Sequence, residues 1–415
     1  MIDRKRGAAL LALAATAALV MSGCTSSGSP KWNSAGSSSD GGSATSQSPG
    51  ASAGPGNLSV TPANGAKSVA PADGILVNAG GSAKITSVTV TAGSKTIAGA
   101  VADDGHSWKS TGQLKFNTKY TVTVQADGVA PTTSTFTTVK PSKTVRSKLW
   151  TNAMIESVPN NQTFGVGQPL IVHFYNSIPK SQRDAIVKAL HVEATPAVEG
   201  RWHWVNSTDV HYRPEKYWAA GTKIVVHADL YGVKFAKGIY GESNETKTMN
   251  IGDSHVAIAD NKTHQMKVYI NGVLKKTIPI SMGRGGYVDG GNGNKIDLWT
   301  RTGPHVVIQK TPYWMMSSAS YGLVDKNSPL YYAPEKIYDT VRISYSGEFV
   351  HLRTWTTGDL GHRNSSHGCI NVGQGNAQYM YKLLIPGDIV DVTGTPIKLA
   401  LTDGIGDWGV SWSNW

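Results

Sequence analysis

Residues 344–371 read SYSGEFVHLRTWTTGDLGHRNSSHGCIN, a strand-like run that leads into a loop and then into a cysteine. The run ends at Val350, His351 follows it, and the chain returns through Ser366-His367-Gly368-Cys369. A free cysteine is only a few per cent thiolate at neutral pH, so a nucleophilic Cys369 needs an imidazole to take its proton. His367 would point to the opposite side of an extended chain, whereas His351 can reach across from a neighbouring strand.

The spacing of these residues carries a resemblance to a known family. His351, fourteen intervening residues and then Ser366-His367-Gly368-Cys369-Ile370-Asn371 resemble the signature of the L,D-transpeptidase catalytic domain, also called the YkuD domain. The resemblance continues at Met316-Ser317-Ser318, Tyr321-Gly322, Asn327-Ser328-Pro329, Ser344-Tyr345-Ser346-Gly347 and Gly406-Asp407-Trp408. It covers residues 251–415 and looks like the mycobacterial and actinobacterial lipoprotein subgroup, in which immunoglobulin-like spacer domains precede the catalytic domain.

The resemblance implies a reaction on peptidoglycan stems without a cofactor or a metal. Cys369 would attack the carbonyl of the third residue of a tetrapeptide donor, meso-diaminopimelate, and release the terminal D-Ala. His351 would generate the thiolate, with its ring oriented by the carbonyl of Leu352. An acceptor amine would then complete a 3→3 cross-link in cell wall organisation, or water would complete a carboxypeptidase reaction. The family also implies acylation by β-lactams, carbapenems above all.

The resemblance also implies a set of binding residues. The backbone of the turn Ser366-His367-Gly368-Cys369, together with Tyr332, would hold the oxyanion that forms during acyl transfer. Tyr332 follows from alignment through Asn327-Ser328-Pro329, and the adjacent Tyr331 is a rival for the same role. The expected substrate-binding residues are Met316, Tyr321, Tyr332, Trp355, His367 and Asn371, with Asn371 also fixing the loop.

Other chemistry fits the sequence less well. His351, His362, His367 and Cys369 lack a usual zinc-ligand spacing, and no Cys-x-x-Cys accompanies them. An inactive wall-binding protein would not need both Cys369 and His351. An adhesin built from sandwiches would leave the thiol unexplained.

The expected catalytic domain, residues 251–396, alternates between short strands and turns. Asn271-Gly272 lies between two alternating runs and predicts a β-hairpin. Gly283 to Asn294 is glycine-rich but lacks the lysine and helix of a phosphate-binding loop, so we expect a mobile loop between strands. One helix is expected at 376–384, followed by a strand from Asp388 to Val392.

The preceding residues predict two β-sandwiches, so the expected fold class is mainly β. Period-two runs and Asp-Gly turns predict an immunoglobulin-like domain at 58–143 with Trp108 in its core. A second immunoglobulin-like domain is expected at 144–250. Ser181 and Asp184 resemble a capping box of a short helix in it, and we expect its tryptophans to pack in the core rather than line a glycan groove.

The N-terminus resembles a lipoprotein export signal. A basic start, an apolar run and Met21-Ser22-Gly23-Cys24 predict a leader over residues 1–24, with Cys24 lipidated. Residues 25–57 are mostly Ser, Gly and Ala and predict a disordered tether. We therefore expect an exported protein that is anchored to the membrane through Cys24 and faces the cell wall.

Charge and tail composition complete the prediction. The net charge of +11 fits an anionic wall or membrane surface, because no basic cluster interleaved with aromatics indicates nucleic-acid binding. The C-terminal segment, residues 397–415, contains Trp408, Trp412 and Trp415. We expect this tail to pack back on the catalytic domain or a spacer.

Overall fold

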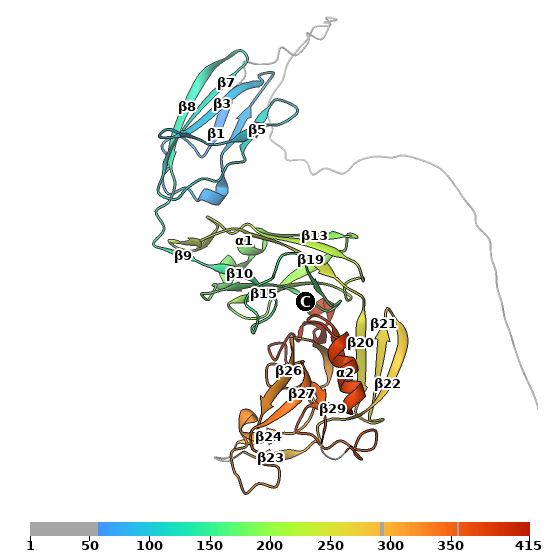
Figure 1. Ribbon diagram of the computed structural model, residues 1–415. Coiled ribbons are helices and arrows are strands. Elements are labelled where there is room, and N and C mark those ends of the chain that lie inside the picture. The colour runs from blue at the N-terminus through green and yellow to red at the C-terminus, as the bar shows by residue number, and fades with distance from the viewer. Residues whose placement is uncertain (1–56, 291–293, 355–356) are drawn as a thin grey trace, which may run out of the picture. The chain divides into compact units, whose positions relative to one another are not determined.

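The computed structural model describes residues 57–290, 294–354 and 357–415. Strands dominate these residues, which contain two α-helices, α1 (Arg183–Val187) and α2 (Gln374–Leu383) (Figure 1). The expected mainly β fold class is confirmed. The predicted leader with Cys24, residues 25–56 of the tether and Trp355 lie outside the described residues. In the described part, no helix is long and apolar enough to cross a bilayer.

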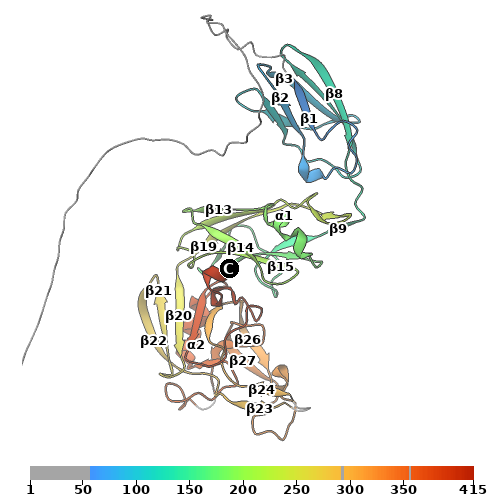
Figure 2. The ribbon, with the colours of Figure 1, turned by 180° about the vertical axis from the view of Figure 1, so that it is seen from behind.

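The first sandwich consists of two facing four-stranded sheets (Figures 1 and 2). One sheet has the order β1 (Leu58–Thr61), β2 (Leu76–Ala79), β6 (Ser107–Ser110), β5 (Gly99–Val101). The other has the order β4 (Lys95–Thr96), β3 (Ile85–Ala92), β7 (Lys119–Ala126), β8 (Val129–Thr137). Alternate residues of β7 point inward and join Trp108, which is 4% exposed, so its predicted core position is confirmed.

The second sandwich also has two four-stranded sheets. The first sheet has the order β10 (Ser147–Trp150), β12 (Leu170–Phe174), β15 (Asp209–Pro214), β14 (Gly200–Trp204). The other has the order β11 (Gln162–Phe164), β19 (Glu245–Ile251), β16 (Lys223–Ala228), β13 (Leu190–Thr195). A small sheet combines β17 (Lys234–Ala236), β18 (Ile239–Gly241) and β9 (Lys143–Val145). Trp218 is buried, and Trp202 and Trp204 pack against the same core.

The short helix of this sandwich forms where expected but without the predicted capping box. Ser181 lies inside a 3-10 turn (Lys180–Gln182), and the residue that caps α1 is Gln182, which makes no side-chain cap hydrogen bond. The turn places Ser181 one residue too early to cap. Ile186, fully buried, holds the helix on the core instead.

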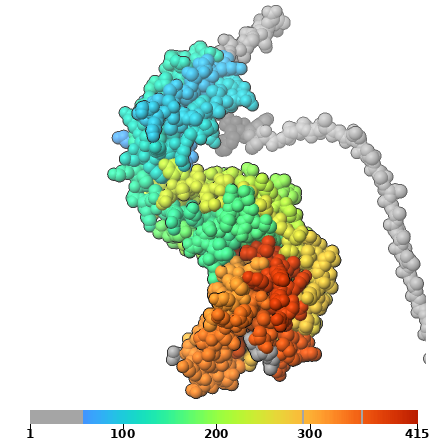
Figure 3. Space-filling view, viewed as in Figure 1, coloured from blue at the N-terminus to red at the C-terminus, as the bar shows by residue number. Residues whose placement is uncertain are grey.

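The C-terminal block is built on a nine-stranded sheet. In spatial order its strands are β25 (Gly303–Val306), β30 (Ile389–Thr393), β20 (His255–Asp260), β21 (Gln265–Ile270), β22 (Val273–Ser281), β29 (Ile370–Val372), β28 (Phe349–Leu352), β27 (Glu335–Arg342) and β26 (Gln309–Met316). Helix α2 packs on β27 and β28 through the buried Ala377 and Met380. In the space-filling view, the orange segment and the red C-terminal part of this block form one continuous body (Figure 3).

The turns of this block follow the sequence in one place and depart from it in another. Asn271 and Gly272 have φ of 49° and 78° and join β21 to β22, so the predicted hairpin is confirmed. The expectation of a loop without strands over 283–294 is wrong. Tyr287–Asp289 forms β23 and pairs with β24 (Lys295–Asp297), because Val288 lies opposite Ile296. The strand is only three residues long and is flanked by glycines, so the sequence shows no clear strand pattern there.

The C-terminal tail packs on the second sandwich, as expected. Trp415 Nε1 donates to the carbonyl of Arg201 at 2.9 Å, and Trp408 Nε1 donates to that of Gly167 at 2.7 Å. The guanidinium of the buried Arg213 lies over the rings of Trp408, Trp412 and Trp415. Cation–π contacts of a desolvated arginine are favourable, so the tryptophans join the tail to this sheet.

Candidate active site

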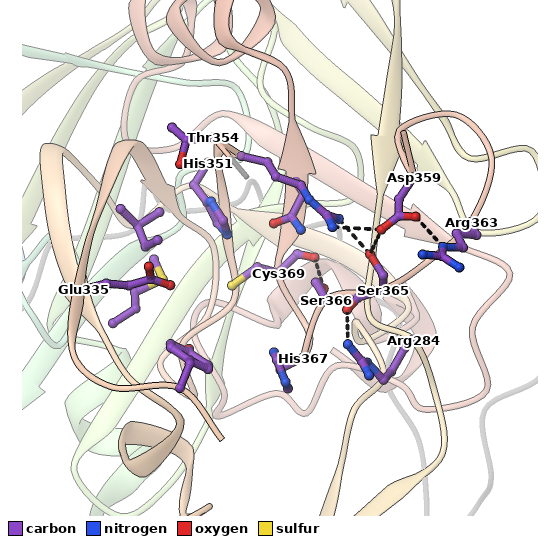
Figure 4. A pocket seen from close by; sticks show the side chains of 15 residues that line it. Arg284, Glu335, His351, Thr354, Asp359, Arg363, Ser365, Ser366, His367 and Cys369 are labelled. Carbon is purple, nitrogen blue, oxygen red and sulfur yellow. Dashed lines mark hydrogen bonds and ion pairs between the residues drawn. The ribbon is translucent and has the colours of Figure 1, made fainter. Parts of the chain in front are cut away.

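Two neighbouring strands bring the predicted cysteine and histidine together. β28 and β29 are parallel and pair His351 with Asn371, and Cys369 comes immediately before β29. The loop between the strands therefore returns Cys369 to the end of the sheet at which His351 lies. Both residues line one cavity of about 620 Å³, in which Figure 4 shows the thiol and the imidazole on the same side. A thiol and an imidazole that share a cavity are the groups that a cysteine nucleophile and its base require.

His351 is held in a single orientation. Its side chain is buried, and Nδ1 lies 2.8 Å from the carbonyl oxygen of Leu352. A carbonyl only accepts hydrogen bonds, so Nδ1 carries the proton and Nε2 is the basic nitrogen. Burial lowers the pKa of His351 to about 4, partly offset by this hydrogen bond. The imidazole is therefore a neutral base at neutral pH.

The surroundings of Cys369 favour its neutral thiol form. Its sulfur donates to the carbonyl of Gly347 at 3.6 Å. Burial raises the pKa of the thiol to about 12, because a thiolate is poorly solvated there. Burial therefore opposes a preformed thiolate–imidazolium pair.

The turn that carries Cys369 is fastened by two hydroxyl groups. Gly368 has φ of 141°, which favours glycine. Its carbonyl accepts from Thr300 Oγ1 at 2.7 Å, and Ser366 Oγ donates to the carbonyl of Cys369 at 2.6 Å. The Gly368 N–H donates to Ser366 Oγ at 3.2 Å, so an oxyanion at this N–H would replace a long hydrogen bond.

The aromatic residues predicted around the thiol form one cluster. The ring of His367 lies 5.5 Å from that of Tyr321 and 5.4 Å from that of Tyr332. Tyr332 lines the cavity and packs beside Cys369, and its rival Tyr331 is not among the described residues that line it. Burial raises the pKa of Tyr332, so its hydroxyl stays protonated and can donate. The geometry therefore favours Tyr332 for the oxyanion role.

Two polar atoms in the cavity wall lack partners among the described residues, Asn371 Oδ1 and His367 Nε2. Both are buried, and burying an unpaired polar atom is costly. A bound substrate could supply the missing partners. Met316, which is 8% exposed, adds an apolar wall, and Trp355 lies outside the described residues.

Comparison with known proteins identifies the family. Residues 254–392 match the model of the L,D-transpeptidase catalytic domain, and residues 66–234 match that of a bacterial Ig domain. L,D-transpeptidase 2 of Mycobacterium tuberculosis is 35% identical over 325 residues, covering 77% of this chain and 74% of the relative. This chain belongs to the L,D-transpeptidase family.

Other L,D-transpeptidases are similar to this chain. L,D-transpeptidase 5 of M. tuberculosis is 34% identical over 333 residues, which cover 77% of this chain and 67% of the relative. The solved structure of LdtMt1 in complex with imipenem is 25% identical, with a TM-score of 0.46, and covers 59% of this chain and 99% of that one.

In this L,D-transpeptidase, a charged network fixes the loop before the cysteine, and sequence reasoning missed it. Arg353 Nη2 donates to Asp359 Oδ2 at 2.8 Å. Arg363 pairs with the other oxygen of the same carboxylate, and Figure 4 labels Asp359 and Arg363. Ser365 Oγ also donates to Asp359, and Arg284 donates to the Ser365 carbonyl at 2.6 Å. Only the four-residue spacing of Asp359 and Arg363 could have indicated part of it.

A buried pair behind the turn also escaped sequence reasoning. Glu348 Oε2 lies 3.0 Å from His305 Nε2, and Glu348 Oε1 accepts from the backbone N–H of Arg301 at 2.7 Å. His305 and Glu348 are almost fully buried. The described residues contain no group of three His, Cys, Asp or Glu side chains placed to hold a metal ion.

Proposed function

We propose that this L,D-transpeptidase forms 3→3 cross-links through a thioester between Cys369 and a tetrapeptide stem. The observation that supports it most is the position of Cys369 beside the oriented imidazole of His351 in one cavity. The reaction class follows from the names of the relatives. Cys369 is the proposed nucleophile, and His351 is the proposed base.

The first half-reaction makes the thioester. Cys369 Sγ attacks the carbonyl of meso-diaminopimelate while His351 Nε2 takes the thiol proton. The oxyanion is stabilised by Tyr332 and the turn, each donor contributing a few kcal/mol of transition-state stabilisation. The C–N bond to D-Ala then breaks, and the D-Ala amine leaves with the proton from His351. The Sγ–C bond remains.

The second half-reaction reverses these roles. The acceptor amine of another stem attacks the thioester carbonyl and gives a proton to His351. The new C–N bond forms, the C–S bond breaks, and the thiol regains its proton. Water in place of the amine would release a tripeptide stem, so exclusion of water decides the yield of cross-link.

The proposal has a direct test in a cross-linking assay. The soluble protein is incubated with disaccharide-tetrapeptide, and dimers that lack one D-Ala are sought by mass spectrometry. We expect them with the wild type and none above background with Cys369→Ala, because the thioester cannot form. Dimer formation by Cys369→Ala would refute the cysteine mechanism.

We also propose that carbapenems acylate Cys369. Related L,D-transpeptidases have been solved with imipenem and with a faropenem-derived adduct. Ring opening by Sγ retains all atoms of imipenem, so the intact protein should gain the full mass of the drug. The adduct should be absent from Cys369→Ala, and an equal mass gain in that variant would contradict the assignment.

We also propose, from the N-terminal sequence, that the protein is exported and anchored to the membrane by a lipid on Cys24. A protein purified from the membrane fraction should begin at Cys24 and carry a diacylglycerol mass. An unmodified N-terminus at another residue would refute the lipid anchor.

A further inference from the structure

A second cavity, of about 690 Å³, also reaches the thiol. Met316, Tyr332, His367 and Cys369 line both cavities, so the sulfur lies where the two meet. A donor whose scissile carbonyl sits at Sγ has its acyl part on one side of the sulfur and its leaving residue on the other. The chemistry of each cavity therefore bears on which part it receives.

Arg342, at the end of β27, gives the second cavity a fixed cation. Its Nε donates to the carbonyl of Ser344 at 2.9 Å, and Nη2 donates to that of Tyr345 at 2.7 Å. The guanidinium lies over the rings of Trp314 and Phe349, at 5.3 and 5.2 Å. Within the described residues, no carboxylate lies within salt-bridge distance of it. Backbone carbonyls and rings orient the charge. The carboxylate that acts on it electrostatically, Asp403, accepts hydrogen bonds from Ser346 and makes no ion pair with Arg342.

Most other charges near the thiol are already paired. In the second cavity, Arg301 is bound by Asp297 through two hydrogen bonds, and Glu348 is paired with His305. In the first cavity, Asp359 holds both Arg353 and Arg363. The side chains of Arg284, Lys295 and Glu335 are exposed, so water screens their charges. Arg342 is half-buried, and its charge is felt more strongly.

The charge of Arg342 does not convert the thiol of Cys369 to a thiolate. Arg342 favours the thiolate and Glu348 opposes it, but burial dominates and holds the pKa of Cys369 at about 12. Arg342 is half-buried, and this burial lowers the pKa of its guanidinium, partly offset by Asp403. An anion brought in by the substrate would offset that cost.

We propose that Arg342 binds the terminal carboxylate of the residue that leaves the donor stem. The inference rests on the proposed function, in which D-Ala leaves and its carboxylate lies one residue beyond the scissile bond. A guanidinium matches a carboxylate with paired hydrogen bonds. Arg342 thereby selects donor stems in which a single residue follows the scissile bond. The amine of the acceptor takes the position that the leaving amine has vacated, so the acceptor approaches the thioester through the second cavity.

The test compares two donors that differ in this one group. Disaccharide-tetrapeptides with a C-terminal carboxylate or a neutral carboxamide are mixed with the protein, and thioester formation is timed by intact-protein mass spectrometry. Hydrogen bonds to charged groups are worth about 1.5–3 kcal/mol, so the wild type should react about 10- to 100-fold faster with the carboxylate. Arg342→Met should remove this preference.

Two further variants separate binding from folding. Arg342→Lys keeps a point charge without the planar fork and should retain part of the preference. Arg284→Met removes a cation from the first cavity and should keep all of it. Iodoacetamide alkylation of Cys369 in Arg342→Met should stay within about twofold of wild type, which shows that the thiol and its surroundings are intact.

The outcomes decide between the two proposals. Equal thioester rates with both donors in the wild type would overturn the role of Arg342 and leave the proposed function standing. A preference that survives in Arg342→Met, or is lost in Arg284→Met, would also overturn it. Slower alkylation in Arg342→Met with equal slowing of both donors would assign Arg342 to the thiol instead. A wild type that forms no thioester with either donor would refute both.

Discussion

Replacing His351 by asparagine should lower kcat/KM for cross-link formation by about 10²- to 10⁴-fold, the contribution of a positioned general base. The side-chain amide of Asn can take over the hydrogen bond from Nδ1 to the Leu352 carbonyl, which is 2.8 Å long in the wild type. It has no counterpart of Nε2. The thiol, whose pKa burial raises to about 12, then loses its proton acceptor. The loss should therefore appear in acylation rather than in stability.

The pH dependence gives this prediction a second readout. Burial lowers the pKa of His351 to about 4, so its basic form persists at and above mildly acidic pH. Activity of the wild type should be retained as pH falls below 6 and be lost as pH approaches 4, since the free enzyme then protonates its base. If activity instead fell with an apparent pKa near the ordinary value for histidine, the buried environment assigned to His351 would be wrong.

His362 offers a matched control in the same loop. It is an exposed histidine between the two strands, and it lines neither cavity. His362→Asn should leave the cross-linking rate within about twofold of wild type, because exposed substitutions away from special contacts have small effects. An equal loss in both variants would mean that His351→Asn acts by disturbing the loop. Full activity of His351→Asn would remove His351 from the mechanism.

The reactive pair could be predicted from sequence because its geometry is local to two strands. His351 lies within one short strand, and Cys369 comes immediately before its parallel neighbour. The register pairs His351 with Asn371, two residues after Cys369, so the two side chains lie near each other. Hairpin chemistry at Asn271-Gly272 is equally local. In both cases, a few adjacent residues contain all the information that the structure uses.

The hydrogen bonds that surround Cys369 and His351 could not be predicted from the sequence in this way. Thr300 is 68 residues from Gly368, and His305 is 43 residues from Glu348. Nothing in the sequence that flanks Thr300, His305 and Glu348 distinguishes them from solvent-exposed residues of the same types. Their roles arise only when the nine-stranded sheet brings distant loops to one end, which depends on the whole core.

Thr300→Val is expected to lower both stability and activity, because Thr300 joins two loops behind Cys369. Its side chain is fully buried; Oγ1 accepts from the N–H of Gly283 at 2.9 Å and donates to the carbonyl of Gly368 at 2.7 Å. Valine has the same shape without the hydroxyl. Two buried backbone groups then lose their partner, at about 1–3 kcal/mol each. The free energy of unfolding should fall by about 2–6 kcal/mol, measured by urea denaturation.

Activity should fall more than stability alone explains, since the freed carbonyl belongs to the residue before Cys369. A small displacement of a reacting group can cost about 10²-fold in rate, and we expect that order of loss in kcat at a temperature where the variant stays folded. Thr300→Ser keeps the hydroxyl and should restore most of both quantities. If Thr300→Val were destabilised yet fully active when folded, the hydroxyl would support the fold without positioning the thiol. If Thr300→Ser failed equally, the lost methyl packing rather than the hydrogen bonds would be responsible.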